Sequence, residues 1–136
     1  MKSTLISILT SLAILLVISS CATVSKGPLE PGEMRLLGLE VPDNGILKMY
    51  VEYYLTIKYQ YEAQGKPEIR RVCFTWSGDG PYCMVATRFK YSSEYGIEAP
   101  IHARPDVSRL ECYVEYVREG KVRRTNTILA HVTGAN

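Results

Sequence analysis

Apolar and polar residues alternate along most of the chain after residue 34. The clearest example is the segment 46–62, with the sequence ILKMYVEYYLTIKYQYE. From Val51 to Tyr61 every second side chain is aliphatic or aromatic, and most of the side chains between them are polar. Successive side chains of a β-strand point to opposite faces of the sheet. The pattern therefore predicts a strand with one buried face and one exposed face.

Six further segments have the character of strands and are separated by turn-forming residues. They are 34–41, 68–76, 82–91, 97–103, 109–118 and 121–132. In 109–118 the apolar face consists of Leu110, Cys112, Val114 and Tyr116. About seven short strands of this kind favour two stacked antiparallel sheets, because stacking buries one face of each sheet.

The end of the chain is similar to the last two strands of an immunoglobulin-like domain. The similar residues are the segment 110–116, LECYVEY, and the Gly turn that follows it. Two features depart from true immunoglobulin domains: Leu110 stands where they carry a Tyr, and Cys73 lies only three residues before Trp76. The expected fold class is therefore all-β, an antiparallel two-sheet sandwich that is immunoglobulin-like in architecture, over residues 34–136.

The N-terminus has the pattern of a secretion signal. Lys2 precedes an apolar run over residues 5–18, which is shorter than the roughly 20 residues of a membrane span and suits a signal-peptide core. The run ends in Ile18-Ser19-Ser20-Cys21, which resembles the lipobox of bacterial lipoproteins. The resemblance implies cleavage before Cys21 and lipid, palmitate included, on the new N-terminal residue. An ordinary secretory signal with an incidental Cys21 is the alternative.

The resemblance also implies a domain organisation and a location. Residues 1–20 are the expected signal peptide, and residues 21–33, with several Pro and Gly, are the expected lipidated Cys and flexible tether. In lipoproteins of enteric-type bacteria an Asp after the Cys favours the inner membrane, and this chain has Ala22. The expected location is the bacterial cell envelope, at the outer membrane and facing the periplasm.

Three cysteines remain once Cys21 is assigned to lipid. A compartment outside the inner membrane permits disulfides. If the turn of the hairpin 68–91 is centred on residue 78, Cys73 and Cys83 lie directly opposite each other, at a separation that suits a disulfide. We therefore expect the Cys73–Cys83 bond and a buried thiol at Cys112. A bond between Cys73 and Cys112 is the competing arrangement.

Composition and motifs exclude several classes of function. The chain has 16 Lys and Arg against 14 Asp and Glu, a formal charge of +2, which gives no electrostatic basis for binding nucleic acid. Ten Tyr against two Phe and one Trp suit a pleated, half-buried surface. No close pair of Cys or His indicates a zinc site, and no nucleophile elbow or phosphate loop is present. We therefore expect no metal, no cofactor and no enzymatic activity.

One surface feature is a candidate interaction site. Basic residues gather around the last predicted hairpin: Arg118, Lys121, Arg123 and Arg124. They suit an anionic envelope partner such as a lipid phosphate or an acidic glycan, or they protect an edge strand from aggregation. The expected function is that of a lipid-anchored, monomeric, non-enzymatic binding or structural accessory module of the envelope. A periplasm-facing inhibitor or carrier of a small lipid or glycan is the alternative.

Overall fold

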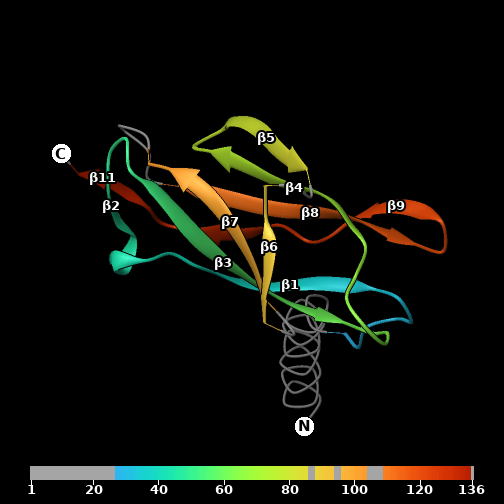
Figure 1. Ribbon diagram of the computed structural model, residues 1–136. Coiled ribbons are helices and arrows are strands. Elements are labelled where there is room, and N and C mark those ends of the chain that lie inside the picture. Colours follow the sequence, from blue (N-terminus) through green and yellow to red (C-terminus); the bar gives the residue numbers. More distant parts are fainter. Residues whose placement is uncertain (1–26, 86–87, 94–95, 104–108, 136) are drawn as a thin grey trace, which may run out of the picture.

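Nearly all of the described chain is β-structure (Figure 1). The computed structural model describes residues 27–85, 88–93, 96–103 and 109–135. Within these ranges the strands are β1 (Met34–Glu40), β2 (Ile46–Lys48), β3 (Glu52–Tyr61), β4 (Ile69–Trp76), β5 (Asp79–Val85), β6 (Lys90–Ser93), β7 (Gly96–His102), β8 (Leu110–Arg118), β9 (Lys121–Arg124), β10 (Ile128–Ala130) and β11 (Thr133–Ala135). A short 3-10 turn, η1, covers Asp43–Gly45. The predicted all-β class is confirmed.

Nine of the eleven described strands form two antiparallel sheets that pack face to face, and β2 and β11 form a separate parallel pair. One sheet has the order β1-β3-β7-β6, and the other has the order β10-β8-β4-β5, with β9 alongside the end of β8. The inner faces of both sheets contribute to one cluster of buried side chains. The predicted two-sheet sandwich is therefore confirmed, and its closer likeness to the immunoglobulin arrangement stays a prediction.

The alternation in the sequence correctly marks the buried faces. In β3 the buried residues are Leu55, Ile57 and Tyr59, and Lys58 and Gln60, which face the other way, are exposed. All four apolar-face residues of β8 are buried as well. They lie opposite the inner face of β4, which supplies Val72, Phe74 and Trp76. These strands form the centre of the core.

One side chain joins the edges of the two sheets. The amide N–H of Leu36 in β1 donates to Oδ1 of Asn126 at 2.8 Å, and Nδ2 of Asn126 donates to the carbonyl of Leu36 at 2.9 Å. A neighbouring strand would form the same pair of bonds. Asn126 therefore satisfies part of an edge that would otherwise remain open to another chain.

The prediction of a single strand over 46–62 is wrong. The chain forms β2, leaves the extended conformation at Tyr50, whose φ is 65°, and then forms β3. A positive φ is unusual for a bulky residue and interrupts a strand. β2 pairs in parallel with β11 rather than continuing β3. The alternating pattern runs through Tyr50 without interruption, so the sequence does not reveal the break.

The prediction of one strand over 82–91 is also wrong. β5 begins at Asp79 and ends at Val85, where the N–H of Arg88 donates to the Val85 carbonyl at 2.9 Å. The next strand, β6, belongs to the other sheet. The chain therefore crosses between sheets inside the predicted strand.

The predicted last strand, 121–132, is divided as well. β9 and β10 both lie along β8, and they are separated at Thr125 and Asn126. Thr125 bonds to Val114 of β8 through its main-chain N–H and through its hydroxyl, each at 2.9 Å. At this point the Thr125 hydroxyl replaces a main-chain carbonyl as the acceptor for the N–H of Val114. After residue 130 the chain leaves β8 and ends in β11.

The two ends of the sandwich carry different parts of the chain. In Figure 1, β2, β11 and the C-terminus lie at the left, and the β8–β9 hairpin lies at the right. At the left end Gly45 has a φ of 80°, and a Cβ there would lie 2.6 Å from the carbonyl oxygen of His131. Close backbone packing therefore fixes β2 against the segment that leads to β11. The right end holds the candidate site.

Candidate functional site

The predicted basic residues lie at the β8–β9 end of the sandwich. The hairpin turn is Glu119-Gly120, with φ values of 52° and 73°. Two successive positive φ angles are typical of a type I′ turn, which matches the twist of a two-residue hairpin. The turn pairs Arg118 with Lys121 and Tyr116 with Arg123. Lys121 and Arg123 therefore project from the same face of β9.

A polar groove of about 470 Å³ lies beside the hairpin. Its walls come from the segment before β1, from β1 itself and from β8 and β9. The lining residues are Glu30, Glu33, Met34, Arg35, Tyr116, Arg118, Arg123, Arg124, Thr125 and Asn126. Four of them are arginines and two are glutamates, so the groove carries a net positive charge. We call it the arginine groove.

Arg118 holds the N-terminal segment against the domain. Its guanidinium donates to the Glu30 carboxylate at 2.9 Å and to the Pro31 carbonyl at 3.1 Å. The hydrogen bond that Arg118 donates to Glu30 raises the pKa of Arg118 above its ordinary value. Backbone bonds between Gly32 and Glu62 and between Glu62 and Glu33 add to the attachment. The described part of the expected tether, residues 27–33, is thus hydrogen-bonded to the sandwich.

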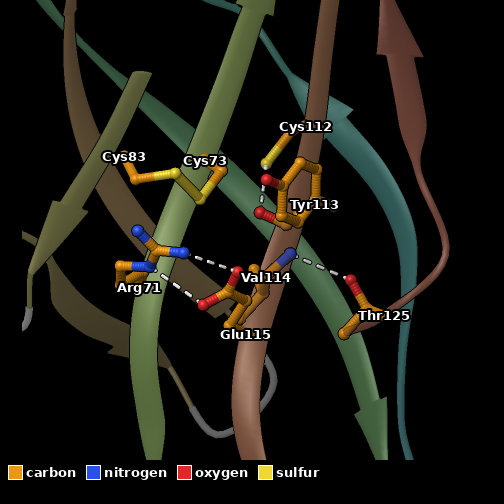
Figure 2. Close-up of a disulfide and its surroundings, with 8 residues drawn as sticks. All are labelled: Arg71, Cys73, Cys83, Cys112, Tyr113, Val114, Glu115 and Thr125. Atoms are coloured by element: carbon orange, nitrogen blue, oxygen red, sulfur yellow. Dashed lines mark hydrogen bonds and ion pairs between the residues drawn. A yellow bond between two sulfur atoms is a disulfide. The ribbon is translucent and has the colours of Figure 1, made fainter. Parts of the chain in front are cut away.

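Arg124 is engaged with the outer face of the sheet. Its guanidinium carbon lies 4.1 Å from the centre of the Tyr113 ring, a cation–π contact. Two residues after Tyr113 on β8, Glu115 accepts two hydrogen bonds from Arg71 of β4, at 2.8 and 2.9 Å (Figure 2). The bond from Arg71 lowers the pKa of Glu115 below its ordinary value. Arg71 and Arg124 therefore flank one carboxylate and are partly neutralised.

Lys121 and Arg123 are the cations of the hairpin that project into solvent. Both side chains are exposed, and neither forms an ion pair with another described residue. Of the four predicted residues, these two are available to an external anion. Arg118 and Arg124 have roles within the fold.

The predicted disulfide is confirmed. Cys73 and Cys83 are bonded, with their Cα atoms 4.0 Å apart (Figure 2). The turn is Ser77-Gly78 rather than a turn centred on residue 78, because Trp76 pairs with Asp79. An irregularity between Phe74 and Trp76 then restores the predicted opposition of the cysteines. The bond thus lies in the predicted register despite a different turn.

Cys112 is free and buried, as predicted. It lies on the inner face of β8 and pairs with Phe74 of β4, whereas Cys73 pairs with Tyr113 and faces the other way. Burial raises the pKa of the Cys112 thiol well above its ordinary range. A neutral buried thiol is a poor nucleophile, so Cys112 acts as part of the core.

Cys21 lies outside the described residues. Within the described ranges, no helix is long and apolar enough to cross a membrane. The same ranges hold no group of three or more His, Cys, Asp or Glu side chains placed to bind a metal ion.

Three of the six charged residues that line the arginine groove were not predicted from the sequence. Glu30, Glu33 and Arg35 contribute to it, and Glu30 is the partner of Arg118 although 88 residues separate them. The charges of residues 30–35 are visible in the sequence, but only the β1–β3 and β8–β9 pairings bring them to one end. No protein-family model matches this chain, and a search of curated proteins found no significant relative.

Proposed function

We propose that this protein is a lipid-anchored lipoprotein of the bacterial envelope whose β-sandwich serves as a non-enzymatic binding or structural accessory module. The observation that carries the proposal is the order of elements at the N-terminus. An apolar leader ends at the lipobox-like Ile18-Ser19-Ser20-Cys21, and the chain is bound to the sandwich from Gly27 onward. An acyl anchor at Cys21 thus leads almost directly into a folded domain. The location we propose is the outer membrane, facing the periplasm.

The working surface in this proposal is the arginine groove with the tip of the β8–β9 hairpin. Lys121 and Arg123 offer two exposed cations, and the groove beside them offers a concave polar wall. Such a surface suits an anionic lipid, an anionic glycan or an acidic patch on an envelope protein.

The anchor is tested by the mass of the mature N-terminus. The protein is extracted from membranes, digested and analysed for the peptide that begins at residue 21. We expect Cys21 to be N-terminal and acylated, and we expect a Cys21→Ala variant to lack the lipid and leave the membrane fraction. A Cys112→Val variant, which removes a different thiol, should keep the lipid. An unmodified Cys21 peptide in the wild-type protein would reject the anchor.

The binding role is tested by crosslinking in cells. The wild-type protein is compared with Lys121→Ala/Arg123→Ala and with a control of equal charge change outside both grooves, Lys48→Ala/Lys58→Ala. We expect the hairpin variant to lose its captured partner and the control to keep it. Loss in both variants, or in neither, would remove the binding role from the hairpin.

A second candidate function is carriage of a small lipid or glycan, and one observation favours it. A groove of about 310 Å³ lies between β5 and the end of β7. It is lined by Phe74, Trp76, Tyr82, Cys83, Met84, Arg88, Pro100, Ile101 and His102. Aromatic side chains beside an Arg suit a ligand with an apolar face and an anionic group. A rise in melting temperature with envelope lipids or glycan fragments, lost in Tyr82→Ala, would support this function.

A further inference from the structure

We propose that the β8–β9 end of the sandwich lies on the membrane, where Lys121 and Arg123 bind the headgroups of anionic phospholipids. The inference rests on the proposed lipid anchor at Cys21 and names the partner of the hairpin cations. The protein then contacts the membrane at two places: through the acyl chains on Cys21, and through the cations of the folded domain.

The first argument is the length of chain between the anchor and the fold. Residues 22–26 separate Cys21 from Gly27. A fully extended chain spans at most about 3.6 Å per residue, so the two Cα atoms lie within about 22 Å of each other. A strand of ten residues such as β3 is itself roughly 33 Å long. The connection is therefore shorter than the domain, and the part of the domain that holds Gly27 stays near the bilayer.

The second argument is where Gly27 is held. Its carbonyl accepts a hydrogen bond of 2.6 Å from the guanidinium of Arg35, at the start of β1. The following residues are tied to the end of β3 through Glu62, and to Arg118 at the end of β8. All of these positions belong to the right end of the molecule in Figure 1, which is also the end of the β8–β9 hairpin. The short connection therefore brings this end toward the lipid.

The third argument is charge complementarity. The Glu30 carboxylate is already paired with Arg118, and Glu33 is paired with Arg35 at 3.5 Å. Lys121 and Arg123 thus remain for an external anion, and phosphodiester groups at a bilayer surface are such anions. Val122, between them in the sequence, projects from the opposite face of β9 and has 58% of its surface exposed. Two cations on one face of a hairpin tip and an exposed apolar side chain on the other suit the interfacial layer of a membrane.

The test measures which end of the protein touches lipid. The full lipidated protein is reconstituted into phosphatidylethanolamine vesicles with or without phosphatidylglycerol, and a nitroxide is placed on a fraction of the headgroups. A fluorophore is attached at Val122→Cys or, in a second protein, at Ile46→Cys in β2. The two sites are equally exposed, at 58% each, and lie at opposite ends of the molecule. The native thiols are lipidated, bonded or buried, so the added thiol is labelled selectively.

We expect headgroup quenching at position 122 and only background quenching at position 46. Each cation near an anionic surface shifts the contact equilibrium by about fivefold. Lys121→Ala/Arg123→Ala should therefore weaken the contact by about 25-fold in vesicles that contain phosphatidylglycerol, while the protein remains attached through its lipid. The control of equal charge change, Lys48→Ala/Lys58→Ala, removes two exposed cations outside both grooves and should leave the quenching at position 122 unchanged.

The outcomes separate this inference from the function on which it rests. A protein that never partitions into the vesicles would overturn the anchor and the orientation together. A protein that partitions, but whose two labels are quenched equally, would overturn the orientation alone. Quenching at position 122 that is unaffected by phosphatidylglycerol and by loss of the two cations would overturn the headgroup contact.

Discussion

The Thr125 side chain supplies hydrogen bonds in the gap between β9 and β10. It is 7% exposed and is the buried polar residue among those described. Its hydroxyl accepts from the Val114 N–H and donates to the Asn126 carbonyl, each at 2.9 Å. It therefore satisfies a main-chain donor of the central strand β8, where an unpaired buried N–H is costly.

Replacing Thr125 by Val should lower the free energy of unfolding by about 1–3 kcal/mol. The new side chain has nearly the same shape but leaves the Val114 N–H without its acceptor. Urea unfolding of the detergent-solubilised protein measures the change, and Thr127→Val, at an exposed position, is the matched control. Equal stability of the two variants would show that the hydroxyl bond contributes little.

The Cys112 thiol should make stability depend on alkaline pH. Burial raises its pKa in the folded protein, whereas an unfolded thiol ionises near pH 8.5. The stabilisation from keeping the thiol neutral is fully present below about pH 8.5 and is lost as the pH rises above that value. The free energy of unfolding should therefore fall more steeply between about pH 8.5 and 10 in the wild type than in Cys112→Val. Parallel curves for the two proteins would contradict this assignment.

At the scale of elements, the Cys73–Cys83 bond supports an exposed strand. β5 lies at the edge of its sheet, pairs only with β4 and is exposed along most of its length. Packing therefore stabilises β5 only weakly. The covalent bond to the buried Cys73 holds β5 against β4 instead. A link that closes a loop of about ten residues contributes about 3 kcal/mol in the chain-entropy model.

Reduction should therefore loosen β5 before it affects the rest of the sandwich. Hydrogen exchange with and without a reductant is expected to show faster exchange in β5 and little change in β8. A Cys73→Ala/Cys83→Ala variant should show the fast pattern in both conditions. Uniformly faster exchange across both sheets would mean that the bond stabilises the whole fold instead.

Asn126 lies between β1 and β10 and forms with Leu36 the pair of hydrogen bonds that a neighbouring strand would form. Asn126→Ala removes both of its hydrogen bonds to Leu36, and each such bond contributes about 1 kcal/mol. We expect a loss of about 2 kcal/mol in the free energy of unfolding, measured by urea unfolding. Gln60→Ala, which shortens an exposed amide on β3, should change it far less. A similar loss in both variants would attribute the effect to the mutation of a surface amide in general.

These elements also show which features the sequence could predict. The buried face of β8 follows from a period of two, which depends only on neighbouring residues. The opposition of Cys73 and Cys83 was predicted from the position of the hairpin turn, and it is kept because the irregularity between Phe74 and Trp76 offsets the shifted turn. The breaks at Tyr50 and Thr125 depend on contacts formed by distant parts of the chain: β2 with β11, and Thr125 with Val114. Sequence alternation continues through the break at Tyr50, and the polar run of residues 123–127 does not by itself place the break at Thr125.

Some features of the candidate site could likewise be predicted from the sequence, and others could not. The grouping of Lys121 and Arg123 on one hairpin is local and could be predicted. The engagement of Arg118 by Glu30, and of Arg124 by Tyr113, requires the tertiary structure. The sequence therefore identified four cations, and the fold distinguishes two that maintain the structure from two that are available to a partner.

At the scale of the whole molecule, the sandwich has unequal ends. One end holds the start of the described chain, the arginine groove and the hairpin, and the other holds β2 and β11. In the arrangement that we propose, the six-residue step from Cys21 to Gly27 and the contacts of Arg118 and Arg35 would convert a lipid attachment into an orientation. In a protein with a long free linker, the same lipid would fix the location and leave the orientation open.

The parallel pairing of β11 with β2 has a practical consequence for reporter fusions. The strand brings the last described residues to the end of the sandwich farthest from the hairpin (Figure 1). In the membrane orientation that we propose, a fluorescent protein or epitope joined after the last described residue would extend outward from the bilayer and leave the cationic tip uncovered. That orientation would also make this end of the sandwich a suitable site for displaying a foreign domain at a membrane surface, with the sandwich as the spacer.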